Sequence, residues 1–151
     1  MDDWAGDPHC FCKPVAKTPA DRRALLKTVV SGNPKFFFGT DSAPHPAETK
    51  RADRFAAGVF TQPHAVGYVI DALEQAVLNN VLRPEDVTRE KLEGFLSKFG
   101  RDFYKVKDQR QETIVLRKPS GPVEDVLKTD DGALEVVPFR RAKMTWDVKF
   151  K

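Results

Sequence analysis

Three consecutive phenylalanines at positions 36–38 constrain the fold of this chain more than any other feature, because three adjacent rings need a buried environment. Asn33 and Pro34 precede the run and Gly39 ends it. A short apolar run between such breaking residues predicts a strand buried on both faces, as in a parallel sheet. A second strand is expected over residues 9–17, "HCFCKPVAK". With a helix between them, the two strands predict a βαβ unit.

The intervening helix has clear start and stop signals. Thr18 is a favourable N-cap, Pro19 suits the first turn, and Asp21 favours the positive end of the helix. Gly32 is the expected stop. A loop is expected over residues 42–60, and helices are expected to begin at Thr61 and at Thr88, the latter ending at Gly100. Short strands are expected at 112–116, 134–139 and 145–150, with turns at 119–121 and 130–132.

Composition narrows the class of protein. The chain has 151 residues, 40% hydrophobic and 31% charged, which is typical of one globular domain. No apolar run approaches the roughly 20 residues that span a bilayer, and the acidic start "MDDW" lacks the features of a signal peptide. A cytoplasmic protein without a membrane partner is therefore expected.

Charge and cysteine content add little beyond this. The net charge of +3 is spread along the chain, and the basic cluster of Arg140, Arg141 and Lys143 is interpreted as a solvated face. Aromatic and basic residues are not interleaved, so no nucleic-acid partner is expected. Cys10 and Cys12 are interpreted as reduced packing residues, because a Cys-x-Cys pair alone is a weak metal signal.

Chemistry is expected immediately after the phenylalanine run, in "GTDSAPH" at 39–45. In α/β sheets and barrels, ligands bind at the carboxyl ends of the strands, where Asp41 would project. Its carboxylate can bind a metal or act as a general base, and Pro44 can hold His45 over the same opening. The alternative is that Asp41 forms an Asx-turn and His45 is merely exposed.

Several stretches together resemble one enzyme family. "FFFGTDSAPH" with "AAGVF" at 56–60 resembles the last barrel strand and following loop of the monofunctional dihydroorotases, which are cyclic amidohydrolases of the metal-dependent TIM-barrel superfamily. "PHCFCKPVAKTPADRRAL", "LEGFLSKFGRDFY" and the tail "MTWDVKF" are also similar to that family. The resemblance covers essentially the whole chain.

The resemblance implies a role for each matching residue. Asp41 matches the aspartate that binds one metal of a two-zinc centre and passes a proton from the bridging hydroxide to the leaving ring nitrogen. His45 matches the histidine that contacts the substrate carboxylate, and Ala57 matches a residue whose backbone binds the same end. Lys13 matches a position that offers main-chain contacts to the pyrimidine ring, where the family often has Leu. The implied reaction interconverts dihydroorotate and N-carbamoyl-L-aspartate in pyrimidine biosynthesis.

The same resemblance shows what this sequence lacks. Its three histidines, His9, His45 and His64, include no His-x-His pair, and nothing matches the family's carboxylated lysine. The implied fold is therefore α/β: residues 1–104 are the C-terminal segment of a TIM (β/α)8 barrel with its last two βα units, and residues 105–151 form a short β-containing C-terminal extension. The complete enzyme would be a zinc-dependent homodimer. This chain alone is expected to be inactive and poorly stable, because two barrel strands leave open edges.

Three alternatives remain open. Asp41, His45 and one of the two cysteines could form a mononuclear metal site in a small independent fold. The chain could be a truncated, non-catalytic relative that binds a partner or a full-length subunit. It could also be a small basic module for nucleic acid, which would show strongly salt-dependent binding.

Overall fold

The computed structural model describes residues 6–14, 18–51, 53, 56–107, 112–118 and 121–151. It contains helices and short strands, in agreement with the expected α/β class. The chain divides into two compact units. The first contains the described residues of 1–16, 40–65 and 117–147, and the second contains those of 17–39, 66–116 and 148–151. Each unit has its own buried residues.

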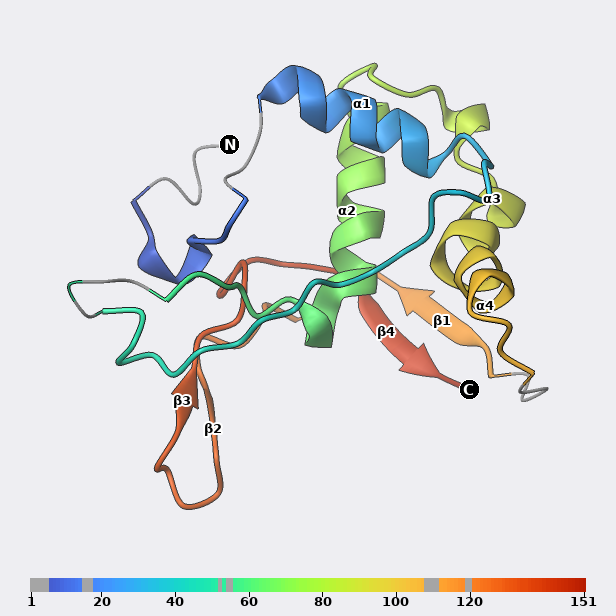
Figure 1. Ribbon diagram of the computed structural model, residues 1–151. Helices are drawn as coiled ribbons and strands as arrows, with labels where there is room; N and C mark the ends of the chain where they lie inside the picture. The colour runs from blue at the N-terminus through green and yellow to red at the C-terminus, as the bar shows by residue number, and fades with distance from the viewer. Residues whose placement is uncertain (1–5, 15–17, 52, 54–55, 108–111, 119–120) are drawn as a thin grey trace. The chain divides into compact units, whose positions relative to one another are not determined.

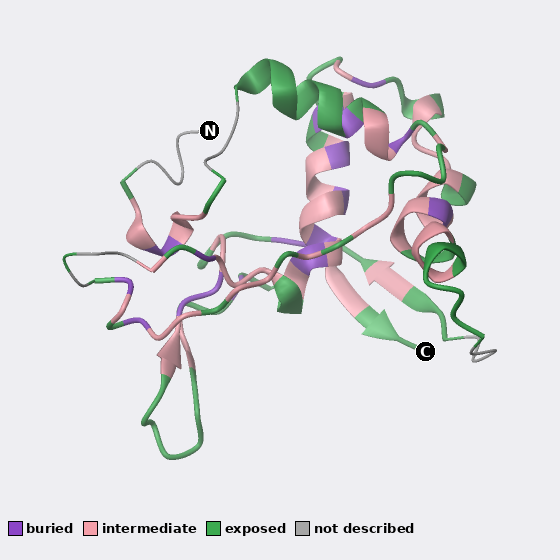
Figure 2. Cartoon of the chain, in the orientation of Figure 1, coloured by how far each residue is buried: buried purple, intermediate pink, exposed green. Residues whose placement is uncertain are grey.

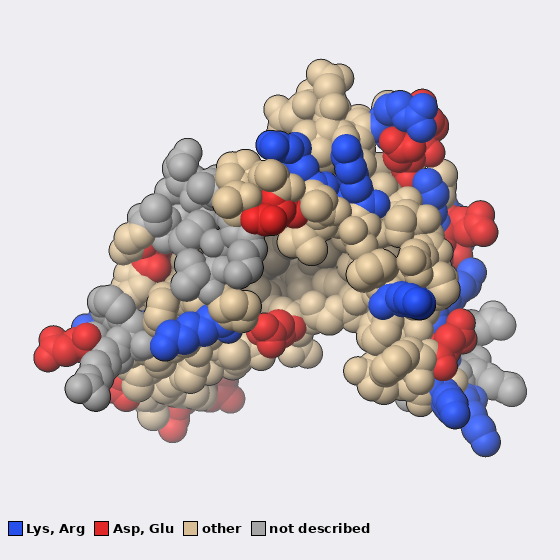
Figure 3. Space-filling model, turned by 45° about the horizontal axis from the view of Figure 1, so that its top comes forward, with Lys and Arg blue, Asp and Glu red and all other residues tan. Residues whose placement is uncertain are grey.

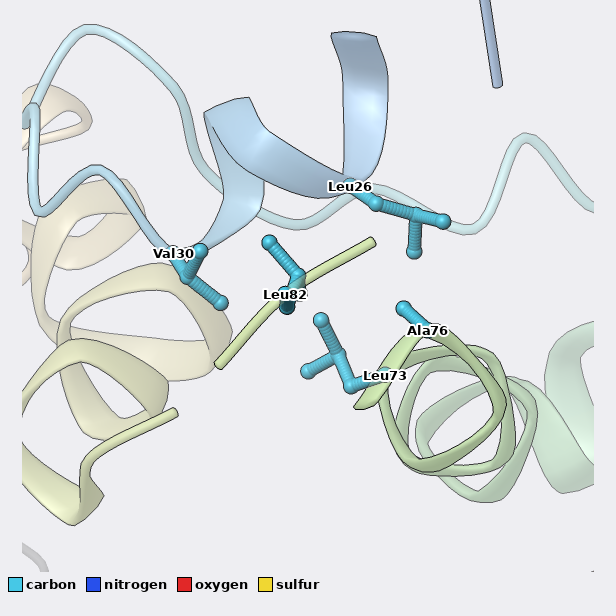
Figure 4. Packing of buried hydrophobic residues seen from close by; sticks show 5 residues of the cluster. All are labelled: Leu26, Val30, Leu73, Ala76 and Leu82. Atoms are coloured by element: carbon cyan, nitrogen blue, oxygen red, sulfur yellow. The ribbon is translucent and has the colours of Figure 1, made fainter. Parts of the chain in front are cut away.

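Helices α1 (Pro19–Val29) and α2 (Ala65–Leu78) provide most of the core of the second unit (Figure 1). Helix α1 begins as predicted: Thr18 and Asp21 form a capping box, and Pro19 is the first helical residue. The buried side chains come from α1 and the turn after it, from α2, and from the segment after α2, and they point toward one another in Figure 4: Leu26, Val30, Leu73, Ala76 and Leu82. Burial of these apolar side chains is the main stabilising contribution in this unit.

The predicted helix after Thr88 forms in three consecutive parts: α3 (Arg89–Glu93), the π-helical turn η4 (Gly94–Lys98) and α4 (Phe99–Phe103). Gly100 was expected to end this helix, and that prediction is wrong. Gly100 lies inside α4, where a Cβ atom would be 3.2 Å from the ring of Phe37. The glycine at this position therefore permits a close contact with a ring rather than a helix stop. Phe38 contacts the same helical segment, since its N–H donates to the carbonyl of Phe95 at 2.9 Å.

Two short sheets account for the described strands. Strands β1 (Ile114–Arg117) and β4 (Asp147–Phe150) form within or next to the predicted ranges 112–116 and 145–150, and they pair with each other. Thr113 and Lys151 exchange two backbone hydrogen bonds of 3.1 and 2.8 Å beside this pair, which is an antiparallel pattern. Strand β2 (Leu127–Lys128), which was not predicted, forms an antiparallel hairpin with β3 (Glu135–Val136).

The hairpin belongs to the first unit. The predicted turn at 130–132 connects its two strands, and Asp131 organises the turn by accepting hydrogen bonds from Thr129 Oγ1 and the Ala133 N–H. Other parts of the first unit are buried more deeply (Figure 2), including Val123, Val137 and Pro138. The predicted loop at 42–60 has no helix or strand among its described residues apart from a bridge at Phe60.

Two expected strands are not strands in this structure. At 9–17, of which residues 15–17 lie outside the described part, the chain forms the 3-10 turn η1 (Pro8–Cys10), because Pro8 occupies its first position and Asp7 caps it. At 36–38, a turn intervenes: the Asn33 side chain accepts from the Lys35 N–H, and the Asn33 carbonyl accepts from the Phe36 N–H. Phe36 is 47% exposed. The predicted βαβ unit is therefore wrong for this structure: the chain turns at residues 33–36, and the Phe38 N–H donates to the Phe95 carbonyl of the helical segment instead of to a neighbouring strand.

The remaining short helical turns connect larger elements. η2 (Gln62–His64) leads directly into α2, and η3 (Pro84–Asp86) precedes α3. Within the part of the chain that the structure describes, none of the helices is long and apolar enough to cross a bilayer. Positive and negative side chains are interspersed over the face shown in Figure 3, as expected for solvated charges.

Candidate functional site

The segment that carries Asp41 and His45 is hydrogen-bonded to residues 59–62. The Ala43 N–H donates to the Val59 carbonyl at 3.0 Å. Ser42 Oγ accepts from the N–H groups of Thr61 and Gln62, both at 3.2 Å. Thr61 Oγ1 in turn donates to the Thr40 carbonyl at 3.0 Å. Asp41 is therefore fixed by contacts on both sides of it.

Asp41 has an unusual backbone conformation, with a φ of +45°. This left-handed region is uncommon for residues other than glycine, although aspartate tolerates it better than most. The expected alternative of an Asx-turn does not form: the turn oxygen here is Thr40 Oγ1, which accepts from the Ser42 N–H at 3.3 Å. Asp41 is exposed, and no described residue is hydrogen-bonded to its carboxylate. Its side chain is thus available to a ligand.

His45 and Ala57, which were predicted to bind the same end of a substrate, are in direct contact. His45 Nε2 lies 3.0 Å from the Ala57 carbonyl oxygen. Since a carbonyl can only accept, the Nε2 atom carries the hydrogen in this contact. His45 is half-buried rather than simply exposed, and this excludes the alternative interpretation of its position.

Gly58 explains how the two segments approach so closely. A Cβ atom at this position would lie 2.5 Å from the Ala43 carbonyl oxygen and 2.9 Å from His45 Cδ2. Its φ of +152° is also unfavourable for residues with a side chain. Only glycine therefore allows the backbone at 58 to pass against residues 43–45.

Lys50 joins three segments around this contact. Its side chain, only 3% exposed as a residue, donates to the carbonyls of Phe11, Ala56 and Gly58 at 3.0, 2.8 and 2.7 Å. The Gly58 N–H also donates to the Phe11 carbonyl at 3.0 Å. The predicted site residue Lys13 is two positions beyond Phe11 and is exposed. The four predicted site residues thus lie on three segments of the first unit, residues 9–14, 40–50 and 56–58, and Lys50 and His45 connect these segments.

These residues do not fit a two-zinc centre by themselves. Such a centre needs several imidazole and carboxylate ligands, and the described residues contain no group of three His, Cys, Asp or Glu side chains that could hold a metal. The mononuclear alternative with Asp41, His45 and Cys10 or Cys12 is therefore wrong. Both cysteines are free and half-buried. Burial, followed by the nearby charge of Asp7, raises the pKa of Cys10 to about 11, so it remains a thiol at neutral pH.

The two other histidines take no part in these hydrogen bonds. His9 is 7% exposed, and its N–H donates to Asp7 Oδ1 at 2.9 Å. His64 lies in η2, with Nε2 2.9 Å from Glu124 Oε2. The backbone N–H of Glu124 and the His64 ring hold the pKa of the Glu124 carboxyl below its usual value. Neither histidine was expected to bind a metal.

Sequence reasoning missed Lys50. A single lysine in a polar loop gives no signal of burial, because lysine is almost always exposed. Its acceptors are backbone carbonyls, which every residue has, so the amino-acid sequence does not indicate where they gather. Gly58 was the one available indication, since an isolated glycine in a loop often marks a close backbone approach.

Comparison with known proteins gives a consistent result, although no family model matches the chain. The dihydroorotase of Saccharomyces cerevisiae is 40% identical over 156 residues, a match that covers 100% of this chain and 40% of the relative. The probable dihydroorotase of Schizosaccharomyces pombe is 44% identical over 138 residues, covering 91% of this chain and 36% of the relative.

Two solved structures are also similar to this chain. The crystal structure of the Saccharomyces cerevisiae dihydroorotase in complex with 5-fluoroorotic acid has a TM-score of 0.82 at 40% identity, over 99% of this chain and 40% of that one. The dihydroorotase of Campylobacter jejuni has a TM-score of 0.74 at 31% identity, over 94% and 38%. The chain is therefore a relative of the dihydroorotases, and it spans about two fifths of their length.

Proposed function

We propose that this chain provides part of the active site of a dihydroorotase, which interconverts dihydroorotate and N-carbamoyl-L-aspartate. The contact between His45 Nε2 and the Ala57 carbonyl carries the proposal, because it brings together the two residues expected to bind the substrate carboxylate. The similarity to dihydroorotases from yeasts and bacteria supports it.

The proposed anion site uses one side chain and one backbone group. Ala57 is exposed, and its N–H has no acceptor among the described residues, so it can donate to a carboxylate. His45 already donates through Nε2, so its Nδ1 carries a hydrogen only when the ring is protonated. A protonated His45 would add a charge-assisted hydrogen bond to the same carboxylate. Lys13, on the neighbouring segment, would contact the ring of the substrate through its main chain.

Asp41 is proposed to transfer the proton. Its exposed carboxylate, held in the left-handed conformation, would accept a proton from the attacking water and deliver it to the ring nitrogen as the amide bond breaks. Ring closure uses the same proton in the opposite direction. Strained backbone at a carboxylate of this kind is typical of functional positions.

A complete enzyme needs more than these residues. Zinc is the metal implied by the resemblance, and this chain would contribute Asp41 as one ligand of a site completed by other residues. The same proposal assigns residues 1–104 to the C-terminal part of an amidohydrolase barrel and 105–151 to a C-terminal extension. It also includes a homodimeric, cytoplasmic enzyme.

The test begins with the natural gene product, whose intact mass is measured together with its dihydroorotase activity. Replacement of Asp41 in that protein by Asn preserves the shape of the side chain but removes its basicity. We expect Asp41→Asn to lower kcat by about 100- to 10,000-fold. The matched control is Asp130→Asn, in the exposed turn of the hairpin, which should leave kcat unchanged.

Each outcome has a distinct meaning. Activity in a product well above 17.0 kDa, abolished by Asp41→Asn, would support the proposal. An active product that is insensitive to Asp41→Asn would contradict the assigned role. An inactive product of 17.0 kDa would instead favour a non-catalytic relative that binds a partner or a full-length subunit.

A further inference from the structure

Lys50 is a buried cation whose three donors all have acceptors. Its ammonium nitrogen lies 3.0, 2.8 and 2.7 Å from the carbonyl oxygens of Phe11, Ala56 and Gly58. A buried charge is tolerated only when it is hydrogen-bonded, and a lysine ammonium has three N–H groups to satisfy. A neutral amine offers only two donors, so the three contacts together require the charged form.

The acceptors of Lys50 flank the proposed substrate-binding residues. Ala56 and Gly58 lie on either side of Ala57, whose own carbonyl is bound by His45. Lys50 thus binds the carbonyls of Ala56 and Gly58, and His45 binds the Ala57 carbonyl between them. The third Lys50 acceptor, Phe11, connects residues 56–58 to the segment that carries Lys13.

Lys50 keeps its ammonium charge although burial disfavours that charge. Burial is the largest influence on Lys50, and it lowers the pKa of the ammonium group, while the charge of Asp7 opposes this shift. An apolar side chain of similar length would avoid the cost of burying a charge but would leave the three carbonyl oxygens without this donor. The advantage of lysine here lies in orienting backbone groups.

We propose that Lys50 is the positioning residue of the anion site: it holds the backbone of residues 56–58 so that the Ala57 N–H and His45 face one substrate carboxylate. The inference rests on the proposed function, since dihydroorotate supplies that carboxylate. Lys50 does not touch the substrate itself and acts through the carbonyls it binds.

The first test needs no ligand. Lys50→Met removes the ammonium group at nearly constant length, Lys50→Arg keeps the charge, and Lys35→Met is the control at an exposed lysine. Hydrogen exchange is followed at the Gly58 amide, which donates to the Phe11 carbonyl, and at the amide of the buried Val123 in the same unit, which donates to the Lys143 carbonyl. We expect Lys50→Met to accelerate exchange at Gly58 by about tenfold or more, with Lys50→Arg intermediate and Lys35→Met unchanged. Unchanged exchange at Gly58 in Lys50→Met would overturn the inference.

A second measurement decides the matter if Lys50→Met unfolds the first unit, which rapid exchange at Val123 would reveal. In the unmodified, nitrogen-labelled protein, the ammonium hydrogens of Lys50 should exchange with water at least about tenfold more slowly than those of Lys35. Equal exchange rates for the two lysines would overturn the inference.

The ligand test separates the inference from the proposed function. The probe is 5-fluoroorotate, the acid named in the structure of the yeast relative, and its binding is followed by fluorine NMR. We expect the natural gene product to bind it and its Lys50→Met variant to bind it at least about tenfold more weakly. In Lys50→Ala, added propylammonium should restore binding, whereas propanol should not. Equal affinity in Lys50→Met and the natural gene product would overturn the inference. A natural gene product that does not bind it would overturn the proposed function, and the exchange data would then decide the role of Lys50 alone.

Discussion

His45 and Lys50 bind neighbouring carbonyl groups of the same backbone segment. His45 Nε2 lies 3.0 Å from the Ala57 oxygen, and Lys50 Nζ lies 2.8 and 2.7 Å from the oxygens of Ala56 and Gly58. Three adjacent peptide units are thereby fixed by two side chains that are five positions apart. The Ala57 N–H itself has no acceptor among the described residues.

The close approach at Gly58 leads to the first prediction. Gly58→Ala should lower the free energy of unfolding by about 2–3 kcal/mol, because it combines an unfavourable φ with a Cβ atom 2.5 Å from the Ala43 oxygen. Urea denaturation measures the change. The matched control is Gly121→Ala, where a Cβ atom would meet nothing within 4 Å and the backbone is not in the left-handed region. Equal stability of the two variants would contradict the strained geometry at Gly58.

The helices were largely predictable because their signals are local. Thr18, Pro19 and Asp21 specify the start of α1 through their own hydrogen bonds and fixed dihedral angle. The first strand was not predictable by the same reasoning, since Asp7 and Pro8 provide an equally local start signal for a 3-10 turn that an apolar pattern obscures. At 36–38, the identity of the rings indicated burial, but the turn at residues 33–36 and the bond from Phe38 to the Phe95 carbonyl take the place of the expected strand.

In the candidate site, too, residues with a local sequence signal could be predicted and a residue without one could not. Asp41, His45 and Ala57 could be identified because a motif carries them, and the structure places His45 and Ala57 in contact. Lys50 could not be identified, because its partners are backbone carbonyls whose positions follow from the tertiary fold. Residue types record side-chain chemistry, whereas backbone acceptors are the same at every position.

The capping box of α1 provides the second prediction. Thr18 Oγ1 accepts from the Asp21 N–H at 3.4 Å, and Asp21 Oδ2 accepts from the Thr18 N–H at 2.9 Å. Thr18→Ala should lower the free energy of unfolding by about 1 kcal/mol, whereas Thr18→Ser should have little effect. Thermal unfolding followed by circular dichroism distinguishes them. If Thr18→Ser were as destabilised as Thr18→Ala, the loss would come from the methyl group and not from the cap.

The buried ring of His9 predicts a pH dependence of stability. Burial, with smaller contributions from Arg141, Arg51 and Lys50, lowers the pKa of His9 below its ordinary value of 6.5, and Asp7 opposes the shift. Between the lowered pKa and 6.5, the unfolded chain binds a proton that the folded chain does not. The free energy of unfolding should therefore fall as the pH decreases through this window.

A variant isolates this contribution from those of other groups. His9→Gln keeps a polar side chain but cannot titrate, while His45 and His64 remain in both proteins. The difference in stability between about pH 7.5 and about pH 5 should be smaller in His9→Gln than in the unmodified protein. Denaturant titrations at the two pH values provide the measurement. An identical pH dependence in both proteins would show that His9 titrates normally in the folded state.

The last prediction concerns Gly94, a helical glycine whose replacement by alanine should not stabilise the protein. In an ordinary helix interior, Gly→Ala stabilises by up to about 1 kcal/mol. At Gly94, however, a Cβ atom would lie 2.5 Å from Cζ of Phe99, whose ring lies against the π-helical turn. Gly94→Ala should therefore destabilise by about 1–3 kcal/mol, and Ser97→Ala, at an exposed position of the same turn, should not.

The cause of that loss can be tested directly by urea denaturation. In a Phe99→Leu background the obstructing ring atoms are absent, so Gly94→Ala should cost much less there than in the unmodified protein. A coupling of this kind assigns the loss to the contact between residue 94 and the ring. The same loss in both backgrounds would assign it to the backbone of the π-helical turn instead. Comparison of the Gly94→Ala loss in the two backgrounds therefore distinguishes a packing requirement from a conformational one. The φ of Gly94 is −57°, which any residue can adopt.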